Sequence, residues 1–171
     1  MSLRVRAALV VVFVLAGCSS PPEVETIDPA QWPQVLADYR GGVTVINVWA
    51  NWCRACVHFL PLFVTLRERV AYDDVEFLSV IVEDPADAAA LAEAEALVLE
   101  LDARFPHFAV QTGVEEALAI LGTDDLPAVL VYGTEGRLQH RVYGDPFEGE
   151  MHLEDVEDAI DAVLPRSEPD S

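Results

Sequence analysis

The sequence predicts an α/β domain built around a central sheet, and three observations support this fold class. Residues 43–49 are β-branched and almost continuously apolar, which is typical of a strand buried on both faces. A helical segment at 53–70 and a second apolar run at 75–82 follow, and this β-α-β order implies parallel strands joined by a right-handed crossover. Further along, Gly133-Thr134-Glu135-Gly136 separates two more strand-like runs with the turn chemistry of a hairpin.

The other elements follow in chain order. Asp28-Pro29 is an N-cap followed by proline at the first helical position, which predicts a helix through about Tyr39 that Gly41-Gly42 ends. Asp84-Pro85 starts another helix in the same way, and its apolar stripe is Leu91, Ala94, Val98, Leu101 and Phe105. The remaining predicted elements are a strand at 108–110, a helix at 114–121, hairpin strands at 128–132 and 138–143, and a closing helix with the apolar face Leu153, Val156, Ile160 and Val163.

The composition is that of one folded domain preceded by a leader. The chain has 171 residues, of which 52% are hydrophobic, enough to bury a core and to exclude a disordered chain. It carries 30 acidic residues against 10 basic ones, all of them arginine, and a formal net charge of -20. Because phosphate contacts need clustered cations, this charge argues against nucleic acid as a partner. With only three cysteines, the chain is not a disulfide-rich scaffold.

Residues 1–17 have the layout of an export signal. Arg4 and Arg6 precede an uninterrupted apolar run from Ala7 to Ala16, which is too short to span a bilayer. The run ends in Leu15-Ala16-Gly17-Cys18, which resembles the lipobox of bacterial lipoproteins, where the cysteine is lipidated and becomes the new N-terminus. We therefore expect a lipoprotein signal peptide and lipidation of Cys18. The alternatives are an ordinary secretory signal with an incidental cysteine and an uncleaved hydrophobic start.

This leader sets the expected domain boundaries. The signal peptide at 1–17 is followed by the lipidated N-terminus and a tether at 18–26, a folded domain at 27–164 and a flexible tail at 165–171. Loss of the two arginines of the leader changes the net charge to -20 − 2 = -22. We expect the domain to be extracytoplasmic and anchored by lipid to a bacterial membrane, where disulfides persist. Ser19 after the lipidated cysteine favours the outer membrane if the cell is Gram-negative.

The chemistry is expected at Cys53 and Cys56, where the first buried strand leads into a helix. Two cysteines at this spacing in a first helical turn can close a small disulfide ring. Cys53 lies at the helix N-terminus, where unpaired N–H groups and the helix dipole stabilise a thiolate, the form that attacks disulfides. Cys56 lies one turn deeper. We therefore predict that Cys53 attacks the partner and that Cys56 resolves the mixed disulfide.

Two other interpretations of the cysteine pair are a zinc site and a purely structural disulfide. A zinc site needs further ligands, but the chain has no second cysteine pair, and finger-like spacing is absent among His58, His107, His140 and His152. A structural disulfide that closes so small a loop stabilises a fold little. We expect neither a metal nor an organic cofactor.

The segment Trp52-Cys53-Arg54-Ala55-Cys56, with Pro61 beyond it, resembles the active site of the thioredoxin superfamily. The stretch Ile46-Asn47-Val48-Trp49-Ala50-Asn51-Trp52-Cys53 is most similar to the TlpA-like extracytoplasmic thiol–disulfide oxidoreductases. A second family landmark, Leu126-Pro127, stands directly before a predicted strand. In the family this proline is cis and packs beside the active-site cysteines, and the backbone before it pairs with substrate.

The resemblance implies a thioredoxin fold, with a central mixed sheet of four to five strands flanked by helices and one additional helix at 86–104 before the cis-proline half. It implies a protein disulfide oxidoreductase in which Cys53 and Cys56 are catalytic. The implied wall of the substrate-binding site is Trp52, Arg54, Leu126 and Pro127. The implied partners are substrate proteins with cysteines or disulfides and a membrane thiol reductant as electron donor, in a reductive role such as cytochrome c maturation.

Three features depart from the family pattern, and one is Ala128, which stands where threonine often follows the cis proline. Arg54-Ala55 replaces the usual Gly-Pro or Glu-Pro pair. Asn47 stands where thioredoxins proper carry a buried aspartate, so the proton of Cys56 must pass to water or to another acid. Glu83 and Asp84, at the carboxyl end of the second predicted strand, are candidate acceptors, and helix capping is the alternative role for both.

Arg54 also leads to a prediction about redox behaviour. Its guanidinium, next to Cys53, favours the thiolate, whereas the acidic surface is spread mostly beyond the Debye length of about 8 Å. We therefore expect a Cys53 thiol pKa below the free value of about 8.5. We also expect a reduction potential above that of cytosolic thioredoxin.

Two other functions are compatible with the same fold. One is a copper chaperone, although such proteins place one more residue between their cysteines and carry a histidine in the loop where this chain has Leu126-Pro127. The other is a thioredoxin-like adaptor without redox activity.

Overall fold

The computed structural model describes residues 21–69, 74–144 and 150–164. The predicted signal peptide, Cys18 and the tail at 165–171 lie outside the described residues, so these assignments stay predictions. Across the described ranges, no helix combines the length and the apolar character needed to cross a bilayer.

Six strands form one mixed sheet in the order β1-β4-β3-β2-β5-β6. Their bounds are β1 (Val24–Ile27), β2 (Val43–Trp49), β3 (Val75–Ile81), β4 (His107–Val110), β5 (Ala128–Tyr132) and β6 (Leu138–Tyr143). The strands β1, β4, β3 and β2 run parallel to their neighbours, whereas β5 is antiparallel to β2 and β6 is antiparallel to β5. Every residue of the inner strand β2 is buried, which explains its continuous apolar and β-branched sequence.

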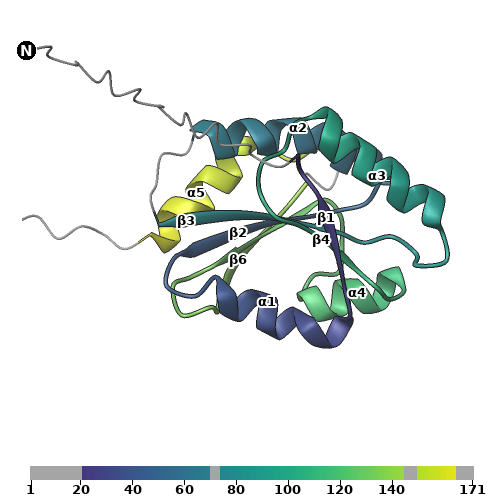
Figure 1. The fold of residues 1–171 in the computed structure, drawn as a ribbon. Coiled ribbons are helices and arrows are strands. Elements are labelled where there is room, and N and C mark those ends of the chain that lie inside the picture. Colours follow the sequence, from purple (N-terminus) through teal and green to yellow (C-terminus); the bar gives the residue numbers. More distant parts are fainter. Residues whose placement is uncertain (1–20, 70–73, 145–149, 165–171) are drawn as a thin grey trace, which may run out of the picture.

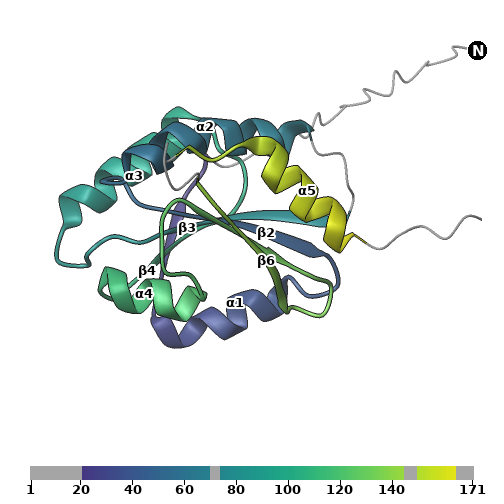
Figure 2. The same ribbon diagram turned by 180° about the vertical axis from the view of Figure 1, so that it is seen from behind.

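Helices cover both faces of this sheet (Figures 1 and 2). One face carries α1 (Trp32–Asp38) and α4 (Val114–Leu121), and the other carries α2 (Arg54–Arg69), α3 (Ala88–Glu100) and α5 (Leu153–Val163). Each face buries its own apolar cluster. The cluster under α2, α3 and α5 includes Phe59, Phe63 and Phe77, and the cluster on the other face includes Trp32, Ile46 and Leu78.

The predicted N-cap at Asp28 is confirmed. Its side chain accepts the N–H of Ala30 at 2.9 Å, and the side chain of Gln31 accepts the N–H of Asp28 at 2.7 Å, which together form a capping box. This box starts a short 3-10 turn, η1 (Pro29–Gln31), that leads directly into α1, so the helix predicted here consists of two segments.

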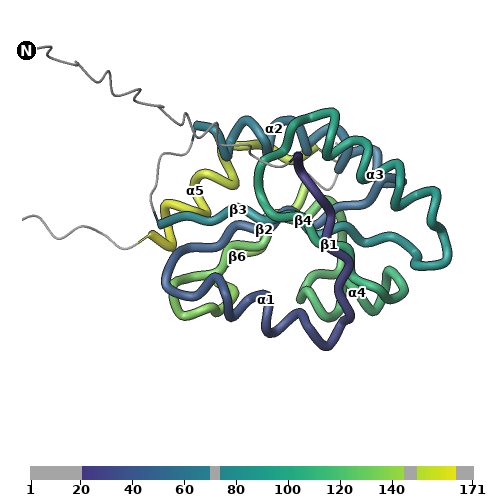
Figure 3. Tube along the Cα trace, in the orientation of Figure 1, coloured from purple at the N-terminus to yellow at the C-terminus, as the bar shows by residue number. Residues whose placement is uncertain are grey.

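The mixed α/β fold with flanking helices is confirmed, but the predicted count of four to five strands is too low because β1 was assigned to the tether at 18–26. β1 lies alongside β4 and pairs with it in parallel (Figure 3). The sheet therefore includes residues 24–26, which the expected boundaries place in the tether. Four residues carry too little periodicity to stand out, and this strand is stabilised by a tertiary contact, the complete burial of Ile27.

The helix predicted to begin at Asp84 begins four residues later, at Ala88. Its N-cap is Asp87, whose Oδ1 accepts the N–H of Ala90 at 3.0 Å. Asp84 instead accepts the N–H of Ala86 at 2.9 Å, within a turn that precedes the helix. The helix-capping role considered for Asp84 therefore belongs to Asp87.

The strand register brings three chain segments to one edge of the sheet. Trp49, the last residue of β2, pairs with Ile81, the last residue of β3. Because β5 runs antiparallel to β2, its first residue, Ala128, pairs with Val48. The segments that follow β2 and β3 and the segment that precedes β5 therefore meet at the carboxyl edge of the parallel strands, where the sites of α/β proteins gather.

Candidate active site

Cys53 and Cys56 form a disulfide at the N-terminus of α2. Their sulfur atoms are 2.00 Å apart and their Cα atoms are 5.2 Å apart. The two residues differ in access to solvent, since Cys56 is fully buried and Cys53 is half-buried. Of the two sulfurs, that of Cys53 is the one a partner protein can reach.

Cys53 occupies the N-cap position of α2. Its carbonyl oxygen accepts the N–H of Val57 at 3.1 Å, and its Sγ accepts the N–H of Cys56 at 3.2 Å. The N–H of Cys53 donates to the carbonyl oxygen of Ala50 at 3.2 Å, which closes the turn between β2 and α2. The positive end of the helix dipole and a backbone N–H therefore face this sulfur, an arrangement that stabilises a thiolate when the disulfide is reduced.

The peptide bond between Leu126 and Pro127 is cis, as predicted. Pro127 is buried directly before β5, and Leu126 is half-buried. Leu126 and Cys53 both pack against the apolar clusters on the two faces of the sheet, which places both residues at its carboxyl edge. The N–H of Leu126 is already paired within the loop, because it donates to Oδ1 of Asp125 at 2.8 Å.

Trp52 and Arg54 stand on either side of Cys53 in the chain, and both are exposed. The indole of Trp52 is 59% exposed, the largest fraction among the exposed large apolar residues of the described chain. An exposed indole and an exposed guanidinium beside a half-buried sulfur form a surface that is partly apolar and locally cationic. That surface contrasts with the acidic character of the chain as a whole.

Glu83 contributes to this site in a way that the sequence does not reveal. Its side chain is buried, at 6% exposure, and its carboxylate accepts the N–H of Asn51 and interacts with the side chain of Trp52. The side-chain amide of Asn51 in turn donates to Oε2 of Glu93 on α3 at 2.6 Å. Glu83 therefore does not cap α3, one of the two roles considered for it, but binds the turn that precedes Cys53.

The environment of Glu83 raises the pKa of its carboxyl group. Burial is the largest cause, and the negative charges of Asp87 and Glu93 act in the same direction. The hydrogen bonds from Asn51 and Trp52 oppose these effects because they favour the ionised form. The result is a buried acid whose protonation state is set partly by groups of the active-site turn.

Asn47 lies in the interior of β2 and is completely buried. Neither polar atom of its side chain has a hydrogen-bond partner among the described residues. It shares the face of β2 with Val45 and Trp49, whose cluster also contains Cys56. An amide cannot take up the proton of Cys56, so β2 offers this thiol no carboxylate acceptor.

A groove of about 720 Å³ begins at Arg54 and follows α2. Its far wall is the segment that leads into α5. The groove combines the apolar side chains of Leu62 and Met151 with two imidazoles, those of His58 and His152. It therefore offers a mixed apolar and polar surface that starts next to the disulfide.

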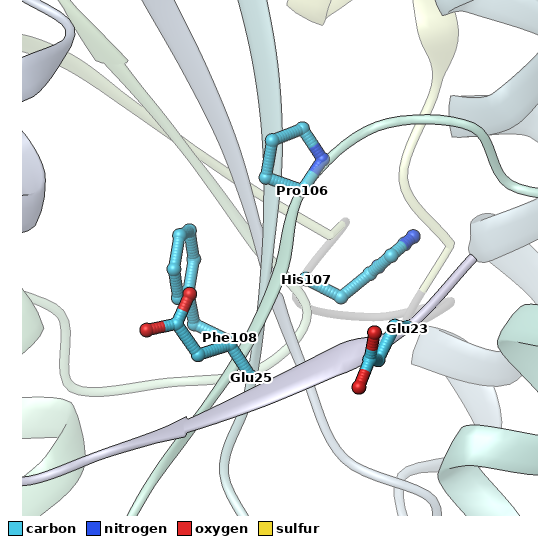
Figure 4. Close-up of a pocket in the computed structure, with 5 residues that line it drawn as sticks. All are labelled: Glu23, Glu25, Pro106, His107 and Phe108. Atoms are coloured by element: carbon cyan, nitrogen blue, oxygen red, sulfur yellow. The ribbon is translucent and has the colours of Figure 1, made fainter. Parts of the chain in front are cut away.

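A second hollow, of about 300 Å³, lies at the amino ends of β1 and β4, the opposite edge of the sheet from Cys53 (Figure 4). His107 is buried there, and its Nε2–H donates to the carbonyl oxygen of Ala103 at 2.8 Å. Burial lowers the pKa of His107. Figure 4 shows that Glu25 and His107 extend to opposite sides of their strands, so they do not converge on a common ligand.

Within the described part of the chain, no three histidine, cysteine or carboxylate side chains are grouped so as to hold a metal ion.

Comparison with known proteins agrees with this geometry. A model of the AhpC/TSA family matches residues 22–141, a range that contains the disulfide, the cis proline and all of the sheet except the end of β6. Among solved structures, a thiol-disulfide isomerase from Corynebacterium glutamicum has a TM-score of 0.62 at 17% identity, covering 77% of this chain and 86% of that one. This likeness shows a shared fold.

Two relatives in Geobacillus are thiol-disulfide oxidoreductases named ResA. The protein of Geobacillus thermodenitrificans is 25% identical over 130 residues, which are 76% of this chain and 68% of the relative. The protein of Geobacillus kaustophilus is 25% identical over 152 residues, which are 89% of this chain and 80% of the relative.

Proposed function

The chain belongs to the AhpC/TSA family, and on that premise we propose that it is a thiol–disulfide oxidoreductase that exchanges electrons with protein cysteines through Cys53 and Cys56. The observation that carries this proposal is the asymmetry of the disulfide, in which a half-buried sulfur at a helix N-terminus is bonded to a fully buried one. Both Geobacillus relatives bear this activity in their names. The groove beside Arg54 provides room for a polypeptide segment of the substrate.

The reduced pair acts on a substrate disulfide in two steps. The thiolate of Cys53 attacks one substrate sulfur, the S–S bond of the substrate breaks, and the released substrate thiolate takes up a proton. Cys56 then loses its proton and attacks the Sγ of Cys53, which breaks the mixed disulfide and releases the second substrate thiol. Two electrons have passed to the substrate, and the pair ends as the disulfide present in the structure.

The residues around the pair assist these steps in different ways. The N–H of Cys56 and the N-terminus of α2 stabilise Cys53 both as attacking thiolate and as leaving group. Leu126 and Pro127 form the wall of the site on the β5 side, and Trp52 and Arg54 form the exposed rim.

We infer that the direction of this exchange in the cell is reductive and that it takes place outside the cytoplasm, for example on the cysteines of a cytochrome c apoprotein. Each turnover leaves the pair oxidised, so a dithiol reductant in the membrane is required. Its thiolate attacks the Cys53–Cys56 disulfide, becomes oxidised to a disulfide itself and restores both thiols. The similarity of residues 46–53 to TlpA-like proteins supports this direction.

We also propose that a lipid on Cys18 anchors the domain to the membrane. The support is the lipobox-like end of the leader, Leu15-Ala16-Gly17-Cys18. Expression of the full chain in a bacterium followed by fractionation tests this point. The wild type should appear in the membrane fraction and Cys18→Ser in the soluble fraction, and mass spectrometry should find acyl chains on the N-terminal peptide. Membrane retention of Cys18→Ser would contradict the anchor.

The central test of the enzymatic proposal uses insulin reduction with dithiothreitol as electron source. The wild type should accelerate the reaction, and Cys53→Ser should abolish the acceleration because it lacks the attacking thiolate. Cys56→Ser should stop at the mixed disulfide, and the proteins trapped on Cys53 in cells then identify the substrates. Equal activity of Cys53→Ser and the wild type would refute the proposal.

A further inference from the structure

Glu83 links the end of β3 to the turn between β2 and α2, which leads into the cysteine pair. It follows β3, and its buried carboxylate binds the backbone N–H of Asn51 and the side chain of Trp52, both in the turn after β2. The amide of Asn51 extends this link to Glu93 on α3. Glu83, together with Asn51, thus connects β3, the active-site turn and α3.

Trp52 depends on this link for its orientation. Its indole is 59% exposed, so little packing surrounds it. A tryptophan nitrogen can only donate a hydrogen bond, and an ionised carboxylate is the stronger acceptor. Trp52 directly precedes Cys53, so the orientation of the indole also defines the surface that a substrate protein meets beside the reactive sulfur.

We propose that Glu83 is a positioning residue for disulfide exchange, whose carboxylate holds the Asn51–Trp52 turn and orients the indole for docking of a protein substrate, and that protonation of this carboxylate loosens the turn. The inference rests on the proposed oxidoreductase function. Substrate that docks on a mobile indole must also order it, and that ordering cost weakens binding. The effect therefore falls on the recognition of proteins and not on the reactivity of the Cys53 sulfur itself.

The surroundings of Glu83 determine whether its carboxyl group is protonated or ionised. Burial and the charges of Asp87 and Glu93 favour the protonated form and raise its pKa, and the two hydrogen bonds favour the ionised form. Glu83 also lines a cavity of about 140 Å³ between the start of α3 and the ends of β1 and β4, which gives protons a route to a buried group. The other titratable groups that line this cavity are Asp84 and Asp87.

The test compares Glu83→Gln with Glu95→Gln as a matched control. Glutamine can still accept the N–H of Asn51, but it has no charge and is therefore a weaker acceptor for the side chain of Trp52. Glu95→Gln makes the same substitution at an exposed residue of α3 that lies outside the active-site turn. Two substrates are used with each variant, insulin as protein disulfide and glutathione disulfide as small disulfide.

For Glu83→Gln we expect kcat/KM with insulin to fall about tenfold, mainly through KM, because a hydrogen bond to a charged group is lost. The rate with glutathione disulfide should change less than about twofold, since the sulfur and its helix N-terminus are untouched. Glu95→Gln should behave as the wild type with both substrates. Equal losses with both substrates, or no loss with either, would overturn the inference.

Two further measurements separate the inference from a general structural effect. Trp52→Phe has no N–H to donate, so Glu83→Gln should add little in that background, whereas a merely structural role of Glu83 predicts the full loss in both backgrounds. In the wild type, the insulin rate divided by the glutathione disulfide rate should fall as the pH is lowered from 8 to 5, because the ratio cancels the thiolate fraction. This decline should persist in Glu95→Gln and be absent from Glu83→Gln.

If Glu83→Gln does not fold, the pH dependence of the rate ratio in the wild type and in Glu95→Gln still tests the inference, and a ratio that does not vary with pH refutes it. Cys53→Ser runs beside every assay. If it is as active as the wild type, the oxidoreductase proposal fails, whereas a wild-type activity that Glu83→Gln leaves unchanged refutes only the role of Glu83.

Discussion

The backbone N–H of Cys56 donates to the Sγ of Cys53 at 3.2 Å. The next side chain along the chain from Cys53 is the guanidinium of Arg54, which begins α2. The positive environment of the reactive sulfur therefore has a backbone part, and we expect the exposed guanidinium of Arg54 to add a side-chain part. The backbone part comes with the fold, but the side-chain part can be removed by mutation.

Arg54→Ala should lower the reduction potential of the Cys53–Cys56 pair. Loss of the cation disfavours the thiolate and thus the reduced form, by roughly 10–20 mV for an exposed charge at a helix end. Equilibration with glutathione redox buffers followed by thiol alkylation measures the change. Arg69→Ala is the control, because it removes the same charge at the other end of α2, about 22 Å away and beyond the Debye length of about 8 Å. A potential that falls equally in both variants would show that the charge acts only through the overall field.

Ser79→Ala should destabilise the fold although serine is small. The indole Nε1–H of Trp49 donates to Oγ of Ser79 at 2.7 Å between β2 and β3, and both residues are completely buried. The substitution leaves a buried donor without a partner, which costs about 1–3 kcal/mol of unfolding free energy. Urea unfolding of the oxidised protein measures the loss. Thr65→Ala, which removes an exposed hydroxyl bonded to the carbonyl oxygen of Pro61, should cost less than about 0.5 kcal/mol.

Elements with strong local signals were predicted with their correct bounds. The strands β2, β5 and β6 and the helix α4 begin and end at the predicted residues. In each case glycine or proline stands directly beside at least one end of the element, so the local sequence sets its bounds. β1 and the start of α3 differ because both depend on distant partners. β1 needs β4 as its neighbour, and a choice between Asp84 and Asp87 as N-cap depends on how the chain leaves β3.

The candidate site also combines features that the local sequence predicts with features that depend on distant contacts. The cysteine pair and the cis proline follow from short motifs that carry their geometry with them. The bond between Glu83 and Asn51 joins residues 32 positions apart and exists because β2 and β3 are paired to their last residues. No pattern in the chain marks such a contact, so the sequence suggested Glu83 only as a proton acceptor or a cap.

Asn47→Val should stabilise the protein. The amide of Asn47 is buried without a partner among the described residues, which costs free energy that a similarly sized apolar side chain avoids, and valine favours a strand. We expect an increase of about 1 kcal/mol in the unfolding free energy measured with urea. Thr44→Val on the same strand is the matched control, because it removes a hydroxyl that donates to the carbonyl oxygen of Tyr39 at 3.4 Å. That variant should be no more stable than the wild type, and a gain equal to that of Asn47→Val would mean that valine itself is responsible.

His107 should make the stability of the protein depend on pH in the mildly acidic range. Its pKa in the folded state is lowered by burial, so the unfolded chain, with a pKa of about 6.5, binds the proton more tightly. The stability linked to this residue is therefore complete above about pH 6.5 and is lost as the pH falls below it, by at most about 1.4 kcal/mol per pH unit.

His107→Gln keeps a donor for the carbonyl oxygen of Ala103 but has no titratable group. The difference in unfolding free energy between wild type and His107→Gln should be constant above pH 7 and should shift against the wild type between pH 6.5 and 5.5. His140→Gln, which removes an imidazole at an exposed position, is the control. The opposite linkage of Glu83, whose raised pKa favours the folded state at low pH, is common to all three proteins and cancels in the differences. A difference that does not vary from pH 7.5 to pH 5 would show that His107 is not the group responsible.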